Sequence, residues 1–386
     1  MNSTAKRVIG LGLAVLLLVG IGFAVFWGRL NSGDAKPGTP GSSEDLTVVN
    51  GVIGSEKKPF FDDPDVQAIF AENGLDVEVV TAGSRQIATS VDLTDVDFVF
   101  PSSSPAAEKI KRETKASTVY APFYSPMAIA TFKPIVTVLE AAGIASQDAS
   151  GTWHLDMKAY LKAVAEGKRW SDLPGAKTAY PSTRSVLISS TDIRQSNSAA
   201  MYLSMASYVA NENTIVSSAD AQAKVIDEMA SLFLEQGFSA SSSDAPFEDY
   251  LSQGIGSKPM VMVYEAQFLG RAMSGDGAIT DDMVLMYPSP TVFSKHSVVP
   301  LTDTGNTVGK LLTTDKRLAK LAALYGFRPA DPKVFTEQLT AHQLEAPPLP
   351  VDVVEPPSYE TLESMIDEIS TRYDTPAPPE SADSDQ

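Results

Sequence analysis

The sequence of 386 residues contains no cysteine. This absence excludes disulfide bridges, thiolate metal sites, a cysteine nucleophile and the lipid-modified cysteine that tethers many bacterial surface proteins. Histidine is also scarce, because His154, His296 and His342 are the only three, and they are far apart without the spacing of metal ligands. We therefore expect no metal site and no cofactor.

Basic residues are few compared with acidic ones. Lys and Arg number 30 and Asp and Glu number 48, which gives a formal net charge of -18 and argues against a nucleic-acid partner. The segment 345–386 has eleven acids and one base, so it alone contributes -10. The remaining chain carries only -8, and an anionic ligand therefore stays possible.

A long apolar run lies near the N-terminus. Val8 to Trp27 are 20 consecutive uncharged residues that follow Lys6 and Arg7. This length suffices to cross a membrane, and the positive flank predicts residues 1–7 in the cytoplasm and the body on the extracytoplasmic face. The alternative is a cleaved signal peptide, whose apolar stretch would be shorter and followed by a small-x-small site. We expect an uncleaved single-pass anchor at 8–27 in the cell membrane.

Two segments are typical of extended chain. Residues 28–45 are rich in Gly, Ser, Pro and Asp and predict a flexible linker, whereas 344–386 form an acidic, Pro-rich tail. Within the tail, apolar residues at helical spacing predict a short amphipathic helix at about 358–372. Its apolar stripe would pack on the chain's own body or on a partner protein. The stripe consists of Tyr359, Leu362, Met365, Ile366 and Ile369.

The body between the linker and the tail alternates short β-branched runs with helical stretches. This alternation predicts an α/β class with mostly parallel sheets. The expected strands are 46–53, 77–81, 97–100, 186–189, 260–264 and 283–287, and the clearest helices are 63–73, 198–210, 219–236 and 315–325.

Several of these strands end in hydroxyl-rich turns. Gly54-Ser55-Glu56, Gly83-Ser84-Arg85 and Pro101-Ser102-Ser103 follow the first three strands, and Ser196-Asn197-Ser198 precedes a helix. Ligands of open α/β sheets bind at such strand ends, where backbone N–H groups and the positive ends of helices are presented. Serine and threonine hydroxyls suit an oxyanion or a small polar molecule.

The order of these turns resembles the type II periplasmic-binding fold of ABC-transporter substrate-binding proteins, in its molybdate-binding-like branch. The resemblance covers about residues 46–343, and the order of the short motifs carries it. They are Gly54-Ser55-Glu56, Gly83 to Ala88, Asp95 to Ser102, Ser196 to Tyr202, Val263-Tyr264-Glu265 and Tyr325 to Pro329.

This resemblance implies two α/β lobes joined by a hinge of two crossings. The crossings are expected near 121–125 and near 263–267. Lobe 1 would then consist of 46–124 and 264–343, and lobe 2 of 125–263. An N-terminal transmembrane helix would precede them.

The resemblance also implies a ligand site between the lobes. Members of the family hold their ligand through positions that correspond to Ser55, Ser84, the turn of Ser196, Asn197 and Ser198, and Tyr264. The position of Ser102 in its loop adds this residue to the candidates. Arg85 is either a charge-assisted partner of an anion or an exposed or ion-paired structural residue.

We therefore expect a substrate-binding protein rather than an enzyme. It would close on a small polar or anionic ligand and deliver it to an ABC permease or another membrane protein. An alternative is a membrane-tethered scaffold or sensor with the same fold. A remote alternative is a serine-type cell-envelope hydrolase, since Ser55 and Lys58 match the Ser-x-x-Lys pattern, but no Lys-Thr-Gly or Gly-x-Ser-x-Gly motif accompanies them.

Overall fold

The computed structural model describes residues 46–373 apart from 238, 346, 348 and 351. The anchor predicted at 8–27 and the linker predicted at 28–45 lie outside the described residues. Within the described part of the chain, no helix is both long and apolar enough to span a bilayer. The described residues belong to one compact unit.

One half of the main sheet is a parallel α/β arrangement, which we call lobe 1. Its strands are β1 (Thr47–Ile53), β2 (Leu75–Thr81) and β3 (Phe98–Phe100), with β1 between the other two. Alternate residues face opposite sides of the sheet, because side chains have a period of two along a strand. Phe98 and Phe100 therefore belong to one apolar core and Val99 to the other.

Helices cover both faces of this sheet. The core that contains Phe98 is closed by α3 (Pro64–Glu72), α13 (Asp303–Thr314) and α14 (Lys316–Leu324). The core that contains Val99 is closed by α4 (Ser84–Thr89) and α5 (Ser104–Thr114). A 3-10 turn, Ser55–Lys57, and α2 (Lys58–Phe61) follow β1 directly.

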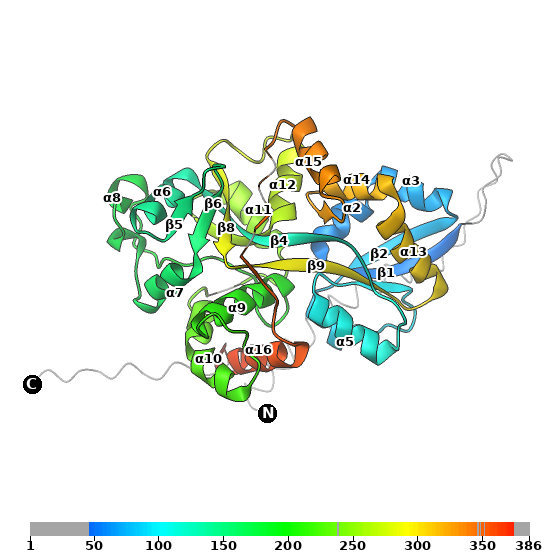
Figure 1. The fold of residues 1–386 in the computed structure, drawn as a ribbon, viewed down its shortest axis with the longest axis horizontal. Coiled ribbons are helices and arrows are strands. Elements are labelled where there is room, and N and C mark those ends of the chain that lie inside the picture. Colours follow the sequence, from blue (N-terminus) through cyan, green and yellow to red (C-terminus); the bar gives the residue numbers. More distant parts are fainter. Residues whose placement is uncertain (1–45, 238, 346, 348, 351, 374–386) are drawn as a thin grey trace, which may run out of the picture. The chain divides into compact units, whose positions relative to one another are not determined.

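Two long strands connect lobe 1 with the rest of the chain (Figure 1). Strand β4 (Tyr120–Phe132) pairs with β9 (Thr291–Pro300) along its first half and with β7 (Met260–Tyr264) and β8 (Met283–Ser289) along its second half. The crossing expected near 121–125 thus lies within β4.

The return crossing lies later in the chain than the sequence predicted. At 263–267, β7 ends and α12 (Glu265–Met273) begins, but the next strand, β8, still pairs with β4 and β6 (Trp153–Asp156). The chain re-enters lobe 1 along β9, whose last residues pair with β3. A buried ion pair links the start of α12 to β10 (Arg328–Pro329), since Arg328 Nε donates to Glu265 Oε2 at 2.6 Å.

The other half of the described chain, lobe 2, has a single large apolar core. Its sheet contains β5 (Ala145–Gln147), β6, β7 and β8 together with the second half of β4. The helices around it are α6 (Lys133–Ala141), α7 (Met157–Ala165), α8 (Ala176–Ala179), α9 (Asn197–Ala210), α10 (Ala219–Leu234) and α11 (Asp244–Gln253), with a 3-10 turn at Trp170–Asp172. The strand expected at 186–189 is an extended segment with one bridge, between Ser189 and Val261.

Side-chain caps begin α3 and α10, whereas the cap expected from Ser196 at the start of α9 is not made. The Asp63 carboxylate accepts from the backbone of Asp65 and Val66 at the start of α3, and Ser218 caps α10 through the backbone of Ala221. α9 is different, because every residue from Asn197 to Ser207 is buried. It is therefore the central helix of lobe 2.

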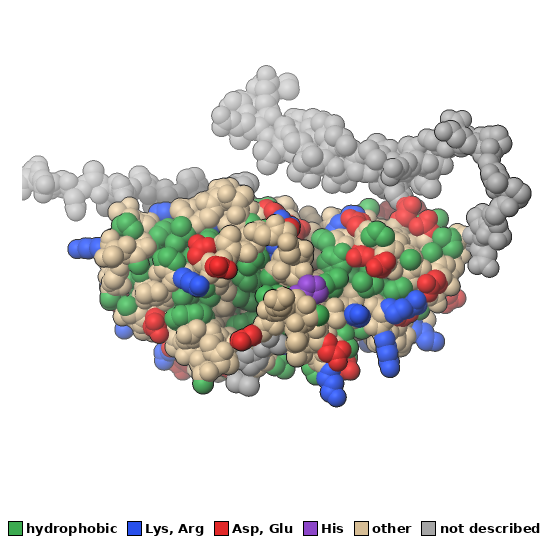
Figure 2. All heavy atoms as spheres, turned by 90° about the horizontal axis from the view of Figure 1, so that it is seen from above, with side chains coloured by type: hydrophobic (Ala, Val, Ile, Leu, Met, Phe, Trp, Pro, Cys, Tyr) green, Lys and Arg blue, Asp and Glu red, His purple; other side chains and the backbone are tan. Residues whose placement is uncertain are grey.

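The C-terminal segment returns to the body of the protein. After α15 (Pro332–Ala341), the short strand β11 (Val353–Val354) pairs in parallel with the start of β9. The helix expected at about 358–372 is α16 (Tyr359–Tyr373), and its apolar stripe packs on the chain's own body. Figure 2 shows acidic and basic side chains mixed over the face that carries α3, α14 and α15.

Candidate ligand-binding site

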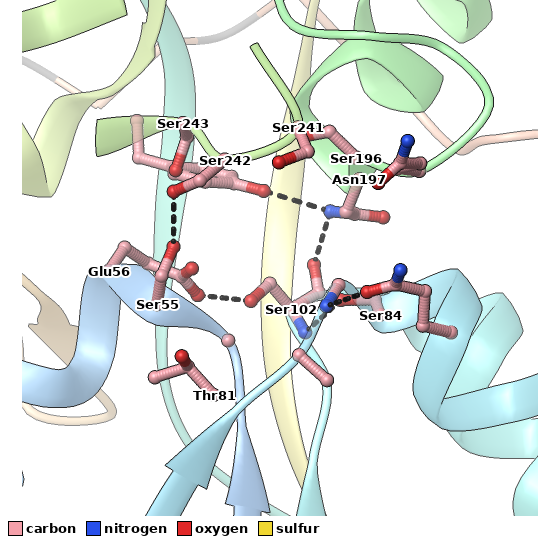
Figure 3. Close-up of a pocket in the computed structure, with 16 residues that line it drawn as sticks. Ser55, Glu56, Thr81, Ser84, Ser102, Ser196, Asn197, Ser241, Ser242 and Ser243 are labelled. Carbon is pink, nitrogen blue, oxygen red and sulfur yellow. Dashed lines mark hydrogen bonds between the residues drawn. The ribbon is translucent and has the colours of Figure 1, made fainter. Parts of the chain in front are cut away.

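The ends of three neighbouring strands form one wall of a cavity of about 220 Å³. Gly54, Ser55 and Glu56 follow β1, Gly83 and Ser84 follow β2, and Ser102 follows β3. These turns meet because carboxyl ends of parallel strands lie at the same edge of a sheet. Figure 3 shows them facing the start of α9 and the loop before α11.

Lobe 2 supplies the opposite wall. Ser196 and Asn197 stand at the start of α9, Ser241 to Ser243 precede α11, and Tyr264 precedes α12. Neither Ser196 nor Ser243 uses its side chain to cap the helix that follows. The first backbone N–H groups of α9 are therefore left without a side-chain cap beside the cavity, where they favour hydrogen-bond acceptors or negative charge. At α11, by contrast, the backbone N–H of Asp244 donates to Ser242 Oγ at 3.3 Å.

The two walls contact each other directly. Ser55 Oγ lies 3.1 Å from Ser242 Oγ, and Asn197 Nδ2 donates to the carbonyl oxygen of Ser102 at 2.9 Å. A Cβ atom on Gly83 would lie 2.4 Å from the carbonyl oxygen of Gln195, so only glycine fits there. The structure thus has the lobes closed on each other.

Six of the eight predicted site residues line this cavity. They are Ser55, Ser84, Ser102, Ser196, Asn197 and Tyr264. Ser198 lies outside the lining, because its buried hydroxyl is within 2.7 Å of Thr191 Oγ1 and 3.0 Å of Ser196 Oγ. The binding role of all these residues stays a prediction.

Arg85 points away from the cavity. Its guanidinium makes two parallel bonds to Glu363 in α16, with Nε to Oε1 at 2.7 Å and Nη2 to Oε2 at 2.5 Å. It also donates to the backbone carbonyl oxygens of Ile193 and Arg194. Of the two interpretations of Arg85, the geometry therefore favours the structural ion pair over contact with an anion.

The sequence reasoning missed several lining residues. Thr81, Gln86, Gln195 and the run Ser241-Ser242-Ser243 also face the cavity. The serine run is followed by Asp244 and a helix, and this pattern is a helix-start signal that could have found it. Glu56 was expected beside the pocket but not among the ligand-binding residues, and it is the described lining residue with a charged side chain.

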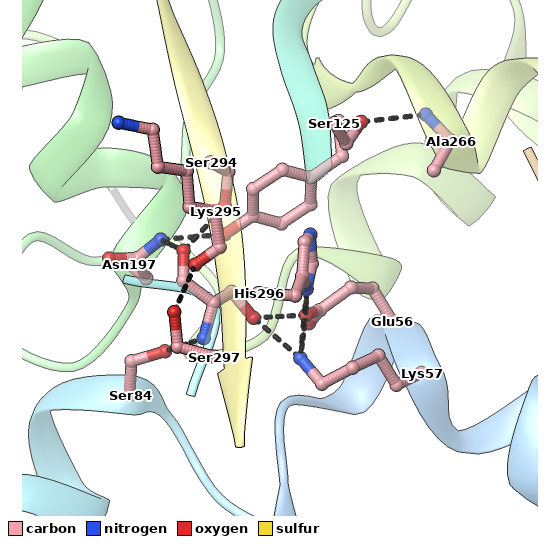
Figure 4. A network of polar contacts seen from close by, with 12 residues as sticks. Glu56, Lys57, Ser84, Ser125, Asn197, Ala266, Ser294, Lys295, His296 and Ser297 are labelled. Carbon is pink, nitrogen blue, oxygen red and sulfur yellow. Dashed lines mark hydrogen bonds and ion pairs between the residues drawn. The ribbon is translucent and has the colours of Figure 1, made fainter. Parts of the chain in front are cut away.

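A buried polar cluster holds Glu56 in place (Figure 4). Lys57 is fully buried, and its Nζ lies 2.5 Å from Glu56 Oε1, 2.7 Å from Ser102 Oγ and 3.1 Å from His296 Nδ1. The hydroxyl of Ser102 donates to the same Oε1. The contacts of Lys57, Ser102 and His296 with the Glu56 carboxylate all involve Oε1, so none of them occupies Oε2.

Burial and the neighbouring charges together shift the pKa values of Glu56, Lys57 and His296. Burial alone would raise the pKa of Glu56, but Lys57 and His296 outweigh it and hold that pKa well below its usual range. Burial, followed by the charge of Lys57, lowers the pKa of His296 to about 4, so its imidazole is neutral at pH 7. Burial also lowers the pKa of Lys57, an effect that the neighbouring Glu56 opposes.

A second carboxyl group lies beyond the lining. Burial, followed by the charge of Glu56, raises the pKa of Asp244. Its carboxylate accepts from Ser242 Oγ at 3.3 Å and from Gln267 Nε2 at 3.2 Å. None of the described residues that line the cavity is Lys or Arg. The cavity therefore has a hydroxyl-rich surface and one acidic corner.

The geometry does not assemble a Ser-x-x-Lys catalytic pair. Lys58 is 41% exposed and forms an ion pair with Asp62, away from the cavity. Within the described residues, no cluster of three or more His, Asp or Glu side chains is placed to hold a metal ion. The arrangement is suited to holding a polar molecule by many hydrogen bonds.

The sequence matches no protein-family model and no curated protein. The structure is similar to that of the sulfate-binding protein SubI from Mycobacterium tuberculosis H37Rv, with a TM-score of 0.52 and 18% identity over 83% of this chain and 98% of that chain. This chain has a fold resembling the type II periplasmic binding proteins. An ABC transporter structure from Clostridium perfringens ATCC 13124 gives a TM-score of 0.50 and 12% identity over 84% of this chain and 98% of that chain.

Both similar structures are of binding or transport proteins rather than of enzymes. The periplasmic molybdate-binding protein from Azotobacter vinelandii has a TM-score of 0.42 and 11% identity, over 72% of this chain and 98% of that chain. This similarity is too low to assign the chain to the molybdate-binding-like branch. The fold is thus mixed α/β and resembles the type II periplasmic binding proteins, and the branch stays a prediction.

Proposed function

We propose that this protein is an extracytoplasmic substrate-binding protein that captures a small polar or anionic ligand between its lobes for an ABC-type importer. The observation that carries the proposal is a cavity with hydrogen-bonding groups from both lobes. A ligand that touches both lobes stabilises the closed state, whereas a ligand that touches one lobe would leave the equilibrium unchanged. The similarity in fold to SubI supports the same class of function.

The volume and chemistry of the cavity limit the ligand. About 220 Å³ is less than the roughly 300–1,000 Å³ of pockets for drug-sized molecules, so the ligand is small. On the lobe 2 side, the start of α9 offers backbone N–H donors, and Ser241 to Ser243 offer hydroxyls. Glu56 Oε2 offers a charged acceptor on the lobe 1 side.

We infer that the ligand presents an acceptor group to lobe 2 and a donor group to Glu56. A hydroxy acid, an amino acid, a polyol or a protonated oxyanion satisfies both walls. A fully deprotonated tetrahedral dianion satisfies only the lobe 2 wall and places negative charge against Glu56, which disfavours it. This reasoning makes sulfate and molybdate weaker candidates than ligands that carry a proton to donate.

The proposal includes the membrane. Residues 8–27 would anchor the chain, with its N-terminus in the cytoplasm and its body outside, near the permease. Protease added to intact cells tests this topology: the body should be degraded while the membrane stays intact, and full protection of the body would contradict it.

A ligand screen by thermal unfolding of the full-length chain tests the binding function. Sulfate, hydrogen phosphate, polyols, hydroxy acids and amino acids are compared, because a ligand at about 100 times its Kd stabilises the folded state by about 2.7 kcal/mol. Ser55→Ala, which removes a cavity hydroxyl, should lower the affinity for the ligand found in the screen about tenfold. Ser90→Ala, an exposed serine, is the matched control. Equal affinity in both variants would contradict the site.

A further inference from the structure

Four of the five residues in the apolar stripe of α16 belong to lobe 2. Leu362, Met365, Ile366 and Ile369 are buried in the lobe 2 core, where the helix packs on α10 and α9. The burial of these four apolar side chains removes a large apolar surface from water, and exposing it again would be costly. We therefore expect α16 to stay attached to lobe 2 when the lobes move. α16 therefore moves with lobe 2.

Polar contacts fix the last turns of α16 to the same lobe. Arg372 Nη2 lies 2.8 Å from Asp227 Oδ1, and Gln222 Nε2 donates to Glu368 Oε2 at 2.8 Å. Both partners are on α10. The ring of Tyr373 lies under the guanidinium of Arg194, with 4.7 Å between Cζ and the ring centroid.

The first turns of α16 contact lobe 1 instead, through charged and aromatic groups. Glu363 is held by the two parallel bonds from Arg85 in α4, and both side chains are mostly shielded, at 17% and 14% exposed. Glu360 pairs with Arg112 of α5 at 2.6 Å. Lys109 Nζ lies 5.6 Å from the ring centroid of Tyr359.

The two attachments differ in how easily they separate. The lobe 2 face of α16 is an apolar core contact, whereas the lobe 1 face consists mainly of ion pairs that water can replace, with Tyr359 packed on the apolar core beneath α4 and α5. Arg85 strengthens the junction, because it also reaches the backbone of Ile193 and Arg194 in lobe 2. Ser84, the preceding residue, lines the cavity. The start of α4 thus connects the cavity to α16.

We propose that α16 is a latch that holds the closed conformation. It stays on lobe 2 when the cleft opens and releases α4 and α5 of lobe 1, with the Arg85–Glu363 pair as the principal contact. The latch raises the closed population before a ligand arrives, and it slows opening afterwards. It uses the hinge motion of the proposed function, but it requires no ligand.

The test measures the distance between the lobes in the full-length protein without ligand. The absence of cysteine makes Glu108→Cys in α5 and Lys158→Cys in α7, both exposed, unique sites for a pair of fluorophores. Glu363→Lys should increase the open-to-closed ratio on the order of tenfold, because it replaces a shielded bidentate pair with like charges. Glu337→Lys, an exposed acid on α15, is the control with the same charge change and should leave the ratio unchanged.

A charge exchange distinguishes the latch from general damage. Arg85→Glu alone should open the lobes like Glu363→Lys, and the double variant Arg85→Glu with Glu363→Arg should restore the closed population. An unchanged distance distribution in both single variants overturns the latch, and so does opening that the exchange fails to reverse. Because this measurement needs no ligand, its result is independent of the ligand screen. The latch proposal can be wrong while the proposed ligand binding is right, and ligand binding can be wrong while the latch proposal is right.

Discussion

On the lobe 1 side of the cavity, Glu56 is fixed by Lys57, His296 and Ser102, which are themselves buried. The lobe 2 side has no such charged cluster among its lining residues, and it presents the uncapped start of α9 and the serines before α11. Lobe 1 is thus a preorganised wall with a defined charge. Lobe 2 is a wall of neutral donors that completes the site when the lobes meet.

The largest effect expected from this difference is on lobe 1. Lys57→Met removes the cation from a buried cluster and leaves the carboxylate of Glu56 without its main partner. We expect the free energy of unfolding to fall by about 3–5 kcal/mol in chemical denaturation. The adjacent Lys58→Met, at an exposed residue, should change it by less than about 0.5 kcal/mol. If both variants are equally stable, the cluster does not organise lobe 1.

The second expected effect is a pH dependence of stability. The unfolded state protonates His296 near the ordinary histidine pKa of 6.5, whereas the folded state resists protonation until about pH 4. Because the unfolded state then binds more protons, stability decreases as pH falls from 6.5 to 4, by at most about 3 kcal/mol. Below this window the lowered pKa of Glu56 continues the loss, since its ionised form is the favoured folded one.

Two variants test whether His296 causes this pH dependence. His296→Gln should flatten the decrease between pH 6.5 and 4, and His342→Gln, at an exposed histidine, should keep it. The measurement is the free energy of unfolding by denaturant at half-unit pH intervals. A decrease that survives in His296→Gln would show that another group is responsible.

A third effect concerns the contact between the walls. Gly83→Ala places a Cβ about 2.4 Å from the carbonyl oxygen of Gln195 and so prevents full closure. We expect calorimetry to show roughly ten- to hundredfold weaker binding of the ligand found in the screen. This loss corresponds to about 1–3 kcal/mol, the usual cost of forcing an extra methyl group into a packed contact. Gly256→Ala, where a Cβ meets open space, is the control. Unchanged affinity in Gly83→Ala would mean that the ligand does not require the closed state.

The smallest expected effect separates lining from supporting hydroxyls on lobe 2. Ser198 supports Ser196 and Thr191 from behind the wall. Ser198→Ala should lower stability by about 1 kcal/mol and change ligand affinity only a few-fold. Ser196→Ala should change the ligand affinity more than Ser198→Ala does, and the stability less. If calorimetry shows the larger loss of affinity for Ser198→Ala and denaturation shows the larger loss of stability for Ser196→Ala, Ser198 is the lining hydroxyl and Ser196 the supporting one.

The sequence predicted the lobe 1 wall well because its signals are local. Ser55, Ser84 and Ser102 each follow a β-branched or aromatic run, and the edge rule for parallel strands brings their turns together without knowledge of the rest. The helix at about 358–372 was equally clear from its periodicity. Its partner was not, because Glu363 and Arg85 are 278 residues apart in sequence.

Other features depend on contacts that one sequence does not encode locally. Nothing in the adjacent Lys57 and Lys58 indicates which one is buried, since the 3-10 turn after β1 decides it. The segment of β4 was interpreted only as a crossing near 121–125, yet it is a long strand that continues through a shift in register between Tyr120 and Phe123. The return crossing was expected at 263–267 from the resemblance, whereas β8 still pairs with β4 and the chain returns along β9.

A crystal structure of the protein saturated with the ligand from the screen tests the central claim most directly. We expect the ligand between the two walls, with a donor group on Glu56 Oε2 and an acceptor group at the start of α9. Ligand bound anywhere outside this cavity, or in contact with only one lobe, would contradict the account.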